Sequence, residues 1–124
     1  MRVPIRTPVR GAFSGKTIGR ILFNATLARH AQAMHGRVLD IAGGASPSYL
    51  PLLSKNIDLV RTDVTASHGV VALDMNEPLP FPEASFDGVL LFNALYAAED
   101  PQALVREIHR VLKDGGMWYL ASPF

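Results

Sequence analysis

The sequence predicts an α/β protein built on a mainly parallel sheet, and three observations support this class. Short apolar runs that suit buried strands alternate along the chain with helical or loop segments, a pattern typical of parallel sheets with crossover connections. The run Gly88–Phe92 is almost continuously apolar, as expected of a strand covered on both faces. The chain has 124 residues, of which 48% are hydrophobic, enough for one domain with a buried core.

Five strands and an irregular start are expected along the chain. Residues 1–15 interleave arginines with prolines and are expected to form a flexible basic arm, followed by a single domain over residues 16–124. A helix is expected over Lys16–Met34, where apolar residues recur near helical spacing. The strands are expected at Val38–Ile41, Asp58–Thr62, Val70–Leu73, Gly88–Phe92 and Met117–Ala121.

Three further helical segments are expected between these strands. Tyr49–Leu53 is expected to start a helix, because a proline is tolerated in a first turn. Asn93–Ala98 is expected to form one or two helical turns. The clearest helix begins at Pro101, a good first helical residue. Its last turn is expected to contain Lys113, and Gly115-Gly116 is expected to end it.

The composition excludes or disfavours several classes of protein. The chain has no cysteine, which rules out disulfides and thiolate metal sites. The four histidines are scattered, so no metal site is expected. The formal net charge of +1 gives no indication of a nucleic-acid partner. The most apolar stretch, Val89–Ala98, is far shorter than the roughly 20 residues of a membrane span. No signal peptide is expected either, so the expected location is cytoplasmic.

The segment VLDIAGGASPS, residues 38–48, places small residues directly after the first expected strand. In open α/β sheets, ligands bind beyond the carboxyl ends of the strands. Gly43 and Gly44 lack a Cβ atom, so the chain can turn sharply and a ligand can approach the main chain. The N-terminus of a following helix is expected to add N–H donors. A tight turn without a ligand is the alternative explanation of the same residues.

Two acidic residues follow the next two expected strands. Asp63 ends the second strand, 19 residues after Gly44, a spacing typical of an acid that binds a ribose diol. Asp74 ends the third strand and is followed by Met75. Because parallel strands end at the same edge of a sheet, the glycine turn and both acids are expected to surround one nucleoside. Taken alone, each acid is also compatible with a turn or capping role.

Four segments resemble the class I S-adenosylmethionine-dependent methyltransferases: VLDIAGGASPSYLPLL, DLVRTDVT, DMNEPLPFPEASFDGVLLFNAL and EIHRVLKDGGMWYLASPF. The resemblance covers roughly residues 36–124, and its most specific parts are LPFPEASFDGVLL and REIHRVLKDGG. It implies a Rossmann-like, doubly wound, mainly parallel sheet with strand order 3-2-1-4-5 that lacks the usual C-terminal strands. It also implies S-adenosyl-L-methionine as the cofactor.

The resemblance further implies a set of cofactor-binding residues: Asp40, Ala42, Gly43, Gly44, Asp63, Asp74, Met75 and Asn93. The first four would line the methionine part of the cofactor. Asp63 would hold the ribose hydroxyls, Asp74 and Met75 would border the adenine, and Asn93 would lie near the sulfonium. No catalytic residue is assigned. Tyr96 and His68 are candidate helpers if the acceptor must lose a proton, and an ordinary exposed loop residue is the alternative for His68.

The chain departs from this family in four places, one of which is Ser46, where members often carry a glycine. Members usually carry glycine where this chain has Ala42, and alanine at positive φ would cost about 1 kcal/mol or more. Many members read Leu-Glu-His where this chain reads Leu95-Tyr96-Ala97, which removes an acid and a histidine. Members continue past the residue that matches Phe124, which leaves the fifth strand as an apolar edge. A longer chain, a homodimer through this edge, or strands supplied from elsewhere are the alternatives.

The expected function is methyl transfer from S-adenosylmethionine to an unidentified small-molecule, sugar or lipid-precursor acceptor. The alternative is a non-catalytic methyltransferase-like domain that binds the cofactor or a partner. Two other nucleotide-binding classes are disfavoured. GAFSGKT, residues 11–17, has three residues between its glycines where a phosphate loop needs four. Residues 42–47 read AGGASP instead of the G-x-G-x-x-G of a nicotinamide-binding domain.

Overall fold

The structure, a computed structural model, describes residues 18–44, 47–92 and 94–121. The chain divides into two compact units. The first unit combines Met1–Met34 with Ser48–Lys55, and the second combines His35–Pro47 with Asn56–Phe124. Among the helices of the described residues, none is long and apolar enough to cross a membrane. The expected boundary between a basic arm and a single domain stays a prediction, because the arm lies outside the described residues.

The first unit contains the helix α2 (Ile18–Ala31) and the short 3-10 helix η1 (Leu50–Leu52). The helix predicted over Lys16–Met34 is confirmed over Ile18–Ala31, and it ends three residues earlier than predicted. Its apolar stripe is buried at Ile21, Leu27 and Ala31. The helix expected to start at Tyr49–Leu53 is wrong: it stops after three residues, because Leu53 takes an extended conformation with φ −76° and ψ 151°.

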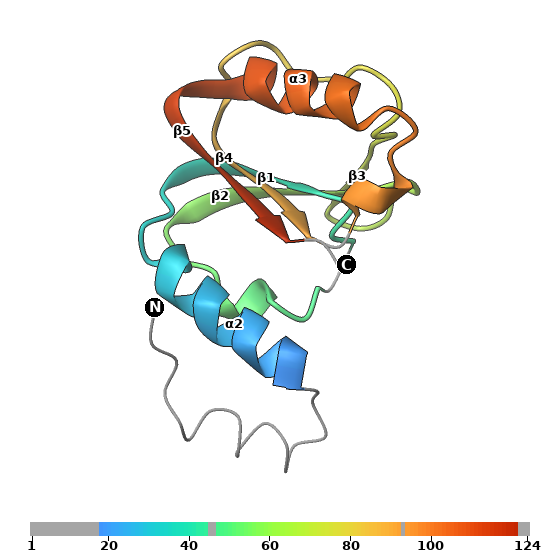
Figure 1. Cartoon of the computed structure of the whole chain (residues 1–124). Coiled ribbons are helices and arrows are strands. Elements are labelled where there is room, and N and C mark those ends of the chain that lie inside the picture. The colour runs from blue at the N-terminus through green and yellow to red at the C-terminus, as the bar shows by residue number, and fades with distance from the viewer. Residues whose placement is uncertain (1–17, 45–46, 93, 122–124) are drawn as a thin grey trace. The chain divides into compact units, whose positions relative to one another are not determined.

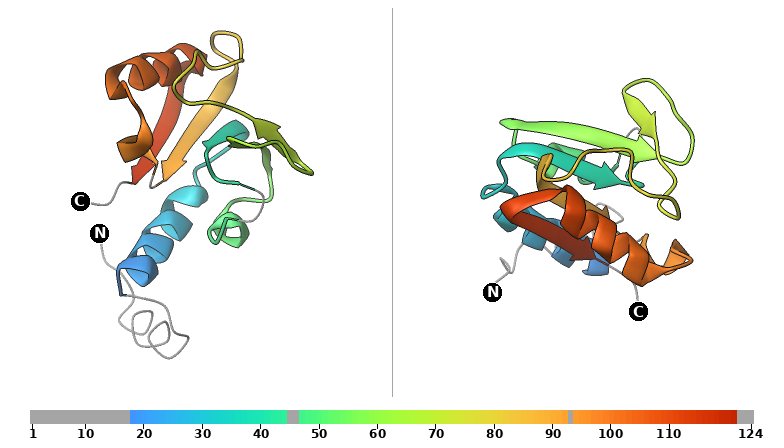
Figure 2. Two further views of the ribbon diagram at one scale, coloured as in Figure 1. Left: turned by 90° about the vertical axis from the view of Figure 1, so that its right-hand side faces the viewer. Right: turned by 90° about the horizontal axis from the view of Figure 1, so that it is seen from above.

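The second unit contains a five-stranded sheet in which every neighbouring pair is parallel. The strands are β1 (Gly36–Ile41), β2 (Ile57–Asp63), β3 (Val70–Ala72), β4 (Phe86–Phe92) and β5 (Leu112–Ala121). Their order is β3-β2-β1-β4-β5, as predicted (Figure 1, Figure 2). This order places β1 in the middle, so the loop after β1 borders the loops after both neighbouring strands.

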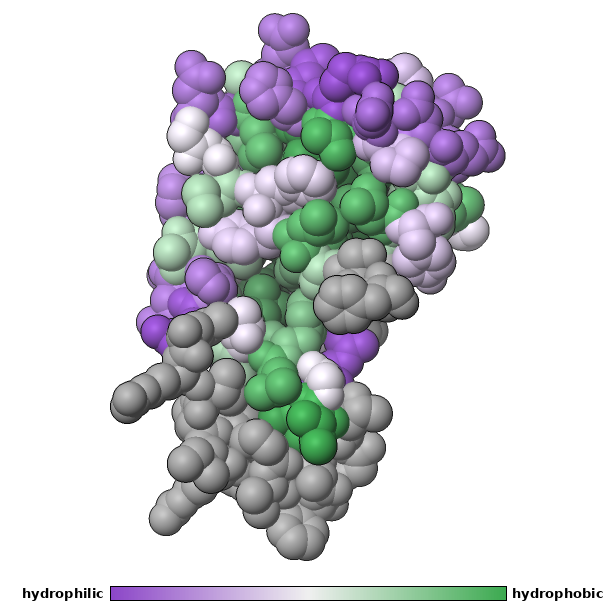
Figure 3. Space-filling model, viewed as in Figure 1, coloured by the Kyte–Doolittle hydropathy of each residue, from purple (hydrophilic) through white to green (hydrophobic). Residues whose placement is uncertain are grey.

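One helix of the second unit, α3 (Pro101–Val111), packs on the sheet. Asp100 caps it, since its Oδ1 accepts a hydrogen bond from the Ala103 N–H at 3.1 Å. The helix buries an apolar stripe against β1 and β4, and this core includes Leu39, Ile41, Val89, Leu91, Leu104, Ile108 and Val111. Hydrophilic side chains gather at the top of Figure 3, where α3 lies. The helix is therefore amphipathic, as its spacing predicted.

The end of α3 differs from the prediction. The helix stops at Val111, and Leu112 is extended (φ −76°, ψ 137°) and begins β5. Lys113 therefore lies in the strand and not in the last helical turn. Leu112 pairs with Phe86, and the register then shifts so that Met117 pairs with Gly88. Pairing with β4 thus ends the helix before the glycines that were expected to end it.

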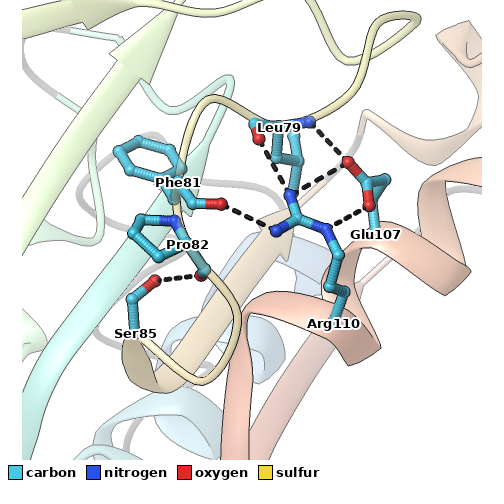
Figure 4. Close-up of polar contacts among 6 residues, drawn as sticks. All are labelled: Leu79, Phe81, Pro82, Ser85, Glu107 and Arg110. Atoms are coloured by element: carbon cyan, nitrogen blue, oxygen red, sulfur yellow. Dashed lines mark hydrogen bonds and ion pairs between the residues drawn. The ribbon is translucent and has the colours of Figure 1, made fainter.

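An ion pair on α3 holds the loop between β3 and β4 (Figure 4). Glu107 accepts a hydrogen bond from the Leu79 N–H at 2.8 Å and pairs with the Arg110 guanidinium at 2.6 Å. Arg110 also donates to the carbonyl oxygens of Leu79 at 2.9 Å and of Phe81 at 2.8 Å. The hydrogen bond from Arg110 lowers the pKa of Glu107, and burial of the carboxylate opposes this. The loop therefore has a defined position over the helix.

Arg110→Ala tests this attachment. We expect a loss of about 1–3 kcal/mol in the free energy of unfolding, because two carbonyl groups and a half-buried carboxylate lose their partner. Urea denaturation followed by circular dichroism measures the loss. Arg106→Ala, which removes an exposed arginine from the same helix, is the control and should stay within about 0.5 kcal/mol of the wild type. Equal effects of the two substitutions would contradict the assigned role of Arg110.

Glu107 also makes stability depend on pH. Its folded-state pKa lies below the ordinary value of 4.5, so its stabilising contribution is present above that value and is lost as the pH falls through the folded-state pKa. The stability difference between the wild type and Glu107→Gln should therefore shrink between about pH 5 and about pH 3. Urea denaturation at several pH values measures it. When Arg110 is already alanine, the stability difference between Glu107 and Glu107→Gln should change less with pH, because the hydrogen bond that lowers the Glu107 pKa is absent. The same pH dependence with and without Arg110 would contradict this explanation.

Candidate functional site

The carboxyl ends of β1, β2 and β3 meet at one edge of the sheet. The Gly44 N–H donates to the Thr62 carbonyl oxygen at 3.1 Å, which joins the loop after β1 to the end of β2. The Leu73 N–H donates to the Asp63 carbonyl oxygen at 2.8 Å, which joins the end of β2 to the residue before Asp74. The glycine loop and both acids therefore lie next to one another, as expected from the order of the strands.

Gly44 and the Asp63 side chain are in close proximity. Gly44 has φ +75°, and a Cβ atom built on it would lie 3.1 Å from Asp63 Oδ2. Glycine is therefore favoured here by the left-handed backbone, and a Cβ atom would also make a tight contact with the carboxylate. Asp63 Oδ1 accepts a hydrogen bond from the Val64 N–H at 2.7 Å, which helps to orient the carboxylate. The half-buried Asp63 carboxylate thus lies against main chain that carries no side chain.

The beginning of this loop is strained at Ala42. Ala42 has φ +63°, the left-handed region in which a residue with a Cβ atom costs about 1 kcal/mol or more. Members of the family usually carry glycine at this position. The alanine of this chain adopts the positive φ at which its Cβ atom is unfavourable. Ala42 and Gly43 are half-buried. Asp40, inside β1, is fully buried and is the least accessible of the predicted residues that the structure describes.

The loop after β3 is ordered by its own polar side chains. Asp74 Oδ1 accepts a hydrogen bond from the Asn76 N–H at 2.9 Å. Asn76 Oδ1 in turn accepts one from the Glu99 N–H at 2.8 Å, which ties this loop to the segment before α3. Asp74 is exposed, whereas Met75 is half-buried against the apolar core. The pair therefore offers an accessible carboxylate beside an apolar side chain.

Sequence reasoning missed Thr62. This residue is fully buried in β2, and its Oγ1 donates to the Asp40 carbonyl oxygen at 2.8 Å. Thr62 Oγ1 also accepts a hydrogen bond from the Ala42 N–H at 3.3 Å. The sequence signal that could have identified it is a hydroxyl-bearing residue near the carboxyl end of a strand, directly before Asp63. The strand itself was recognised, but the partner of the hydroxyl depends on tertiary structure.

The other predicted residues that the structure describes lie in loops and short helical turns. Asn93 lies outside the described residues. The helix expected to follow the glycine loop is, in the described part of the chain, only the 3-10 turn η1, so the prediction of helical N–H donors is wrong there. Tyr96, in the 3-10 helix η2 (Leu95–Ala97), is 74% exposed, and His68 is exposed as well. The described residues contain no cluster of histidine and acidic side chains that could hold a metal ion.

Residues 39–120 match a protein family described as "Methyltransferase domain". The match includes the second half of β1, the whole of β2, β3 and β4 and nearly all of β5, together with α3 and the loops at the candidate edge. The chain therefore belongs to the class I S-adenosylmethionine-dependent methyltransferases, as its sequence motifs and its Rossmann-like strand order predicted.

Individual relatives agree with this family. The ubiquinone/menaquinone biosynthesis C-methyltransferase UbiE of Proteus mirabilis is 30% identical over 118 residues, which cover 80% of this chain and 47% of that protein. A putative methyltransferase from Bacillus halodurans has a TM-score of 0.65 at 25% identity, covering 78% of this chain and 49% of its own. A putative S-adenosylmethionine-dependent methyltransferase from Methanococcus maripaludis shares the fold at 20% identity, with a TM-score of 0.64. The matched region covers 93% of this chain and 64% of that protein. The chain spans about half the length of the curated relatives it matches.

Ala42→Gly tests the strain in the loop. Glycine adopts positive φ without a steric cost, so this substitution should raise the free energy of unfolding by about 1 kcal/mol. Urea denaturation measures the change. Ala103→Gly in α3 is the control and should lower stability by a similar amount, because glycine is unfavourable in a helix with ordinary dihedral angles. A destabilised Ala42→Gly variant would show that Ala42 is not strained.

Proposed function

We propose that this chain binds S-adenosylmethionine at the edge formed by the ends of β1, β2 and β3, and that it transfers a methyl group to a small-molecule acceptor. The observation that carries the proposal is the position of the Asp63 carboxylate beside Gly44, where a Cβ atom would lie only 3.1 Å from it. A carboxylate next to bare main chain can accept hydrogen bonds from a ribose diol while the ligand lies close to the backbone.

The residues present fit the chemical groups of this cofactor. Asp63 would accept hydrogen bonds from the ribose hydroxyls, and Gly43 and Gly44 would leave room for the methionine part beside the main chain. Asp74 would accept from the adenine amino group, and the half-buried Met75 would pack against the ring. Asp40 and Ala42 would support the loop from the end of β1, and Asn93 stays a proposed contact near the sulfonium. The family uses S-adenosylmethionine as its methyl donor.

The main task of these residues is to position the reactants. When bound, S-adenosylmethionine supplies an electrophilic methyl group. Holding the acceptor in line with that group can lower the barrier by about 7–11 kcal/mol in favourable cases. A general base is needed only if the acceptor must lose a proton. Tyr96 and His68 are both exposed, so each is accessible to an acceptor, and neither is assigned a catalytic role.

A quinone-type aromatic ring is the first acceptor to test. The relatives named ubiquinone/menaquinone biosynthesis C-methyltransferase are 30% identical to this chain, and their name describes methylation of a carbon atom in quinone biosynthesis. Such an acceptor belongs to the small-molecule and lipid-precursor classes expected from the sequence. A sugar acceptor is the remaining alternative, and the cytoplasmic location also stays a prediction.

A non-catalytic cofactor-binding or partner-binding domain is the second candidate. It is favoured by the segment Leu95-Tyr96-Ala97, where many members of the family carry an acid and a histidine.

A homodimer through β5 also stays a prediction. Met117 and Leu120 on this strand are 57% and 46% exposed, and apolar edge strands tend to associate.

Calorimetric titration with S-adenosylhomocysteine tests the proposed function. We expect the wild type to bind and Asp63→Ala to bind about 10–100-fold more weakly, since hydrogen bonds to a charged group contribute about 1.5–3 kcal/mol. Asp58→Ala is the matched control, because Asp58 is an exposed aspartate at the opposite end of the same strand, and its affinity should match the wild type. A wild type without binding would overturn the proposal. Binding without methylation of any quinone, sugar or lipid-precursor acceptor would favour the non-catalytic candidate.

A further inference from the structure

We propose that Thr62 is a positioning residue of the cofactor site, because its hydroxyl holds the loop after β1 in its ligand-binding conformation. The proposal rests on the proposed function of that site. Thr62 makes three contacts with alternate residues of the neighbouring segment. Its Oγ1 donates to the Asp40 carbonyl oxygen at 2.8 Å and accepts from the Ala42 N–H at 3.3 Å. Its carbonyl oxygen accepts from the Gly44 N–H at 3.1 Å.

The place of these contacts along the strands explains their importance. The parallel pairing of β1 with β2 extends to Asp40 and Arg61. Thr62 is the next residue of β2, and β1 ends at Ile41. The hydroxyl of Thr62 therefore continues the connection between the two strands beyond their last main-chain pair. It does so at the point where the chain leaves the sheet and turns into the loop.

The burial of Thr62 explains why its hydroxyl must be hydrogen-bonded within the protein. Among the described residues, Thr62 and Asp40 are the buried polar side chains, and each is 0% exposed. A buried hydroxyl costs free energy unless it is hydrogen-bonded. The two hydrogen bonds of this hydroxyl go to the main chain at the end of β1 and at the start of the loop, one as donor and one as acceptor. A valine would fill a similar space in a buried strand, so packing alone does not account for threonine.

The strain at Ala42 gives the hydroxyl a specific task. Ala42 has φ +63°, which an alanine in an unconstrained loop would avoid at a gain of about 1 kcal/mol or more. The hydrogen bond from the Ala42 N–H to Thr62 Oγ1 fixes the chain before the N–Cα bond of Ala42, and the bond from the Gly44 N–H to the Thr62 carbonyl oxygen fixes it two residues later. Together these two contacts favour the left-handed conformation that the side chain of Ala42 opposes.

Thr62 also links this loop to the carboxylate that is proposed to bind ribose. Asp63 directly follows Thr62, and Gly44 lies close enough that an added Cβ atom would be 3.1 Å from Asp63 Oδ2. The distance between the loop and the carboxylate thus depends on the two contacts of Thr62 with Ala42 and Gly44. Loss of the hydroxyl should release Ala42 and alter the space beside Asp63.

Comparison of Thr62→Val with Thr62→Ser tests the proposal. Calorimetry with S-adenosylhomocysteine on the full chain should show about five- to tenfold weaker binding for Thr62→Val, since of the two hydrogen bonds it removes, the one from the Ala42 N–H holds the loop. Thr62→Ser keeps the hydroxyl and should bind within about threefold of the wild type. Urea denaturation identifies conditions in which each variant is fully folded. Equal affinities of the folded valine variant and the wild type would overturn the proposal, since a merely structural residue changes stability alone.

The Ala42→Gly background tests the mechanism through strain. Glycine does not resist positive φ, so Thr62→Val should weaken binding less in this background than in the wild-type background. An equal loss in both backgrounds would overturn the role assigned to Ala42.

Should the valine variant fail to fold, amide hydrogen exchange of the wild type carries the test. The Ala42 amide should be protected, and exchange at the rate of a free amide would overturn the proposal.

The outcomes also separate this inference from the proposed function. A wild type that does not bind S-adenosylhomocysteine overturns the proposed function, and the inference with it. A wild type that binds, with a weakened Asp63→Ala variant and an unaffected Thr62→Val variant, overturns only the role of Thr62. A wild type that binds and is weakened by both substitutions supports both proposals.

Discussion

The parallel hydrogen bonding between β1 and β2 is the constraint on which the candidate site depends. Their paired register ends at Asp40 and Arg61, so the next two residues of β2 lie beside the loop that leaves β1. The first of them, Thr62, bonds that loop through its side chain and its carbonyl oxygen. The second, Asp63, presents its carboxylate to Gly44. A register shifted by one residue would move each of these two side chains to the other face of the sheet and remove this arrangement.

The other side of the site depends on contacts that are distant in sequence. The loop after β3 is joined to the segment before α3 through Asn76 and Glu99. Further along, the same loop is bound by Glu107 and Arg110 of the helix. The helix itself is held by its apolar stripe against β1 and β4. Packing in the core therefore determines where the exposed Asp74 carboxylate lies.

Several features could be predicted from local signals, and others could not. The alternation of apolar runs predicted the strands, and Pro101 predicted the start of α3, because such signals act on neighbouring residues. The end of α3 was wrong because pairing of Leu112 with Phe86 outweighs the helical preference of the segment around Lys113. The helix at Tyr49–Leu53 was wrong for a related reason, since a proline compatible with a first turn does not supply the packing that extends a helix. The roles of the predicted site residues stay predictions.

The sequence by itself determined the class of the protein, the strand order through its family motifs, and the glycines and acids that lie near the ends of the first three strands. Periodicity, glycine positions and motif spacing are properties of the chain, so they could be recognised without coordinates. Only the tertiary structure decided that Ala42 is left-handed, that Thr62 bonds it, and that Gly44 lies against Asp63. These contacts join residues about twenty positions apart, and such pairs meet only after the strands have selected their neighbours and register.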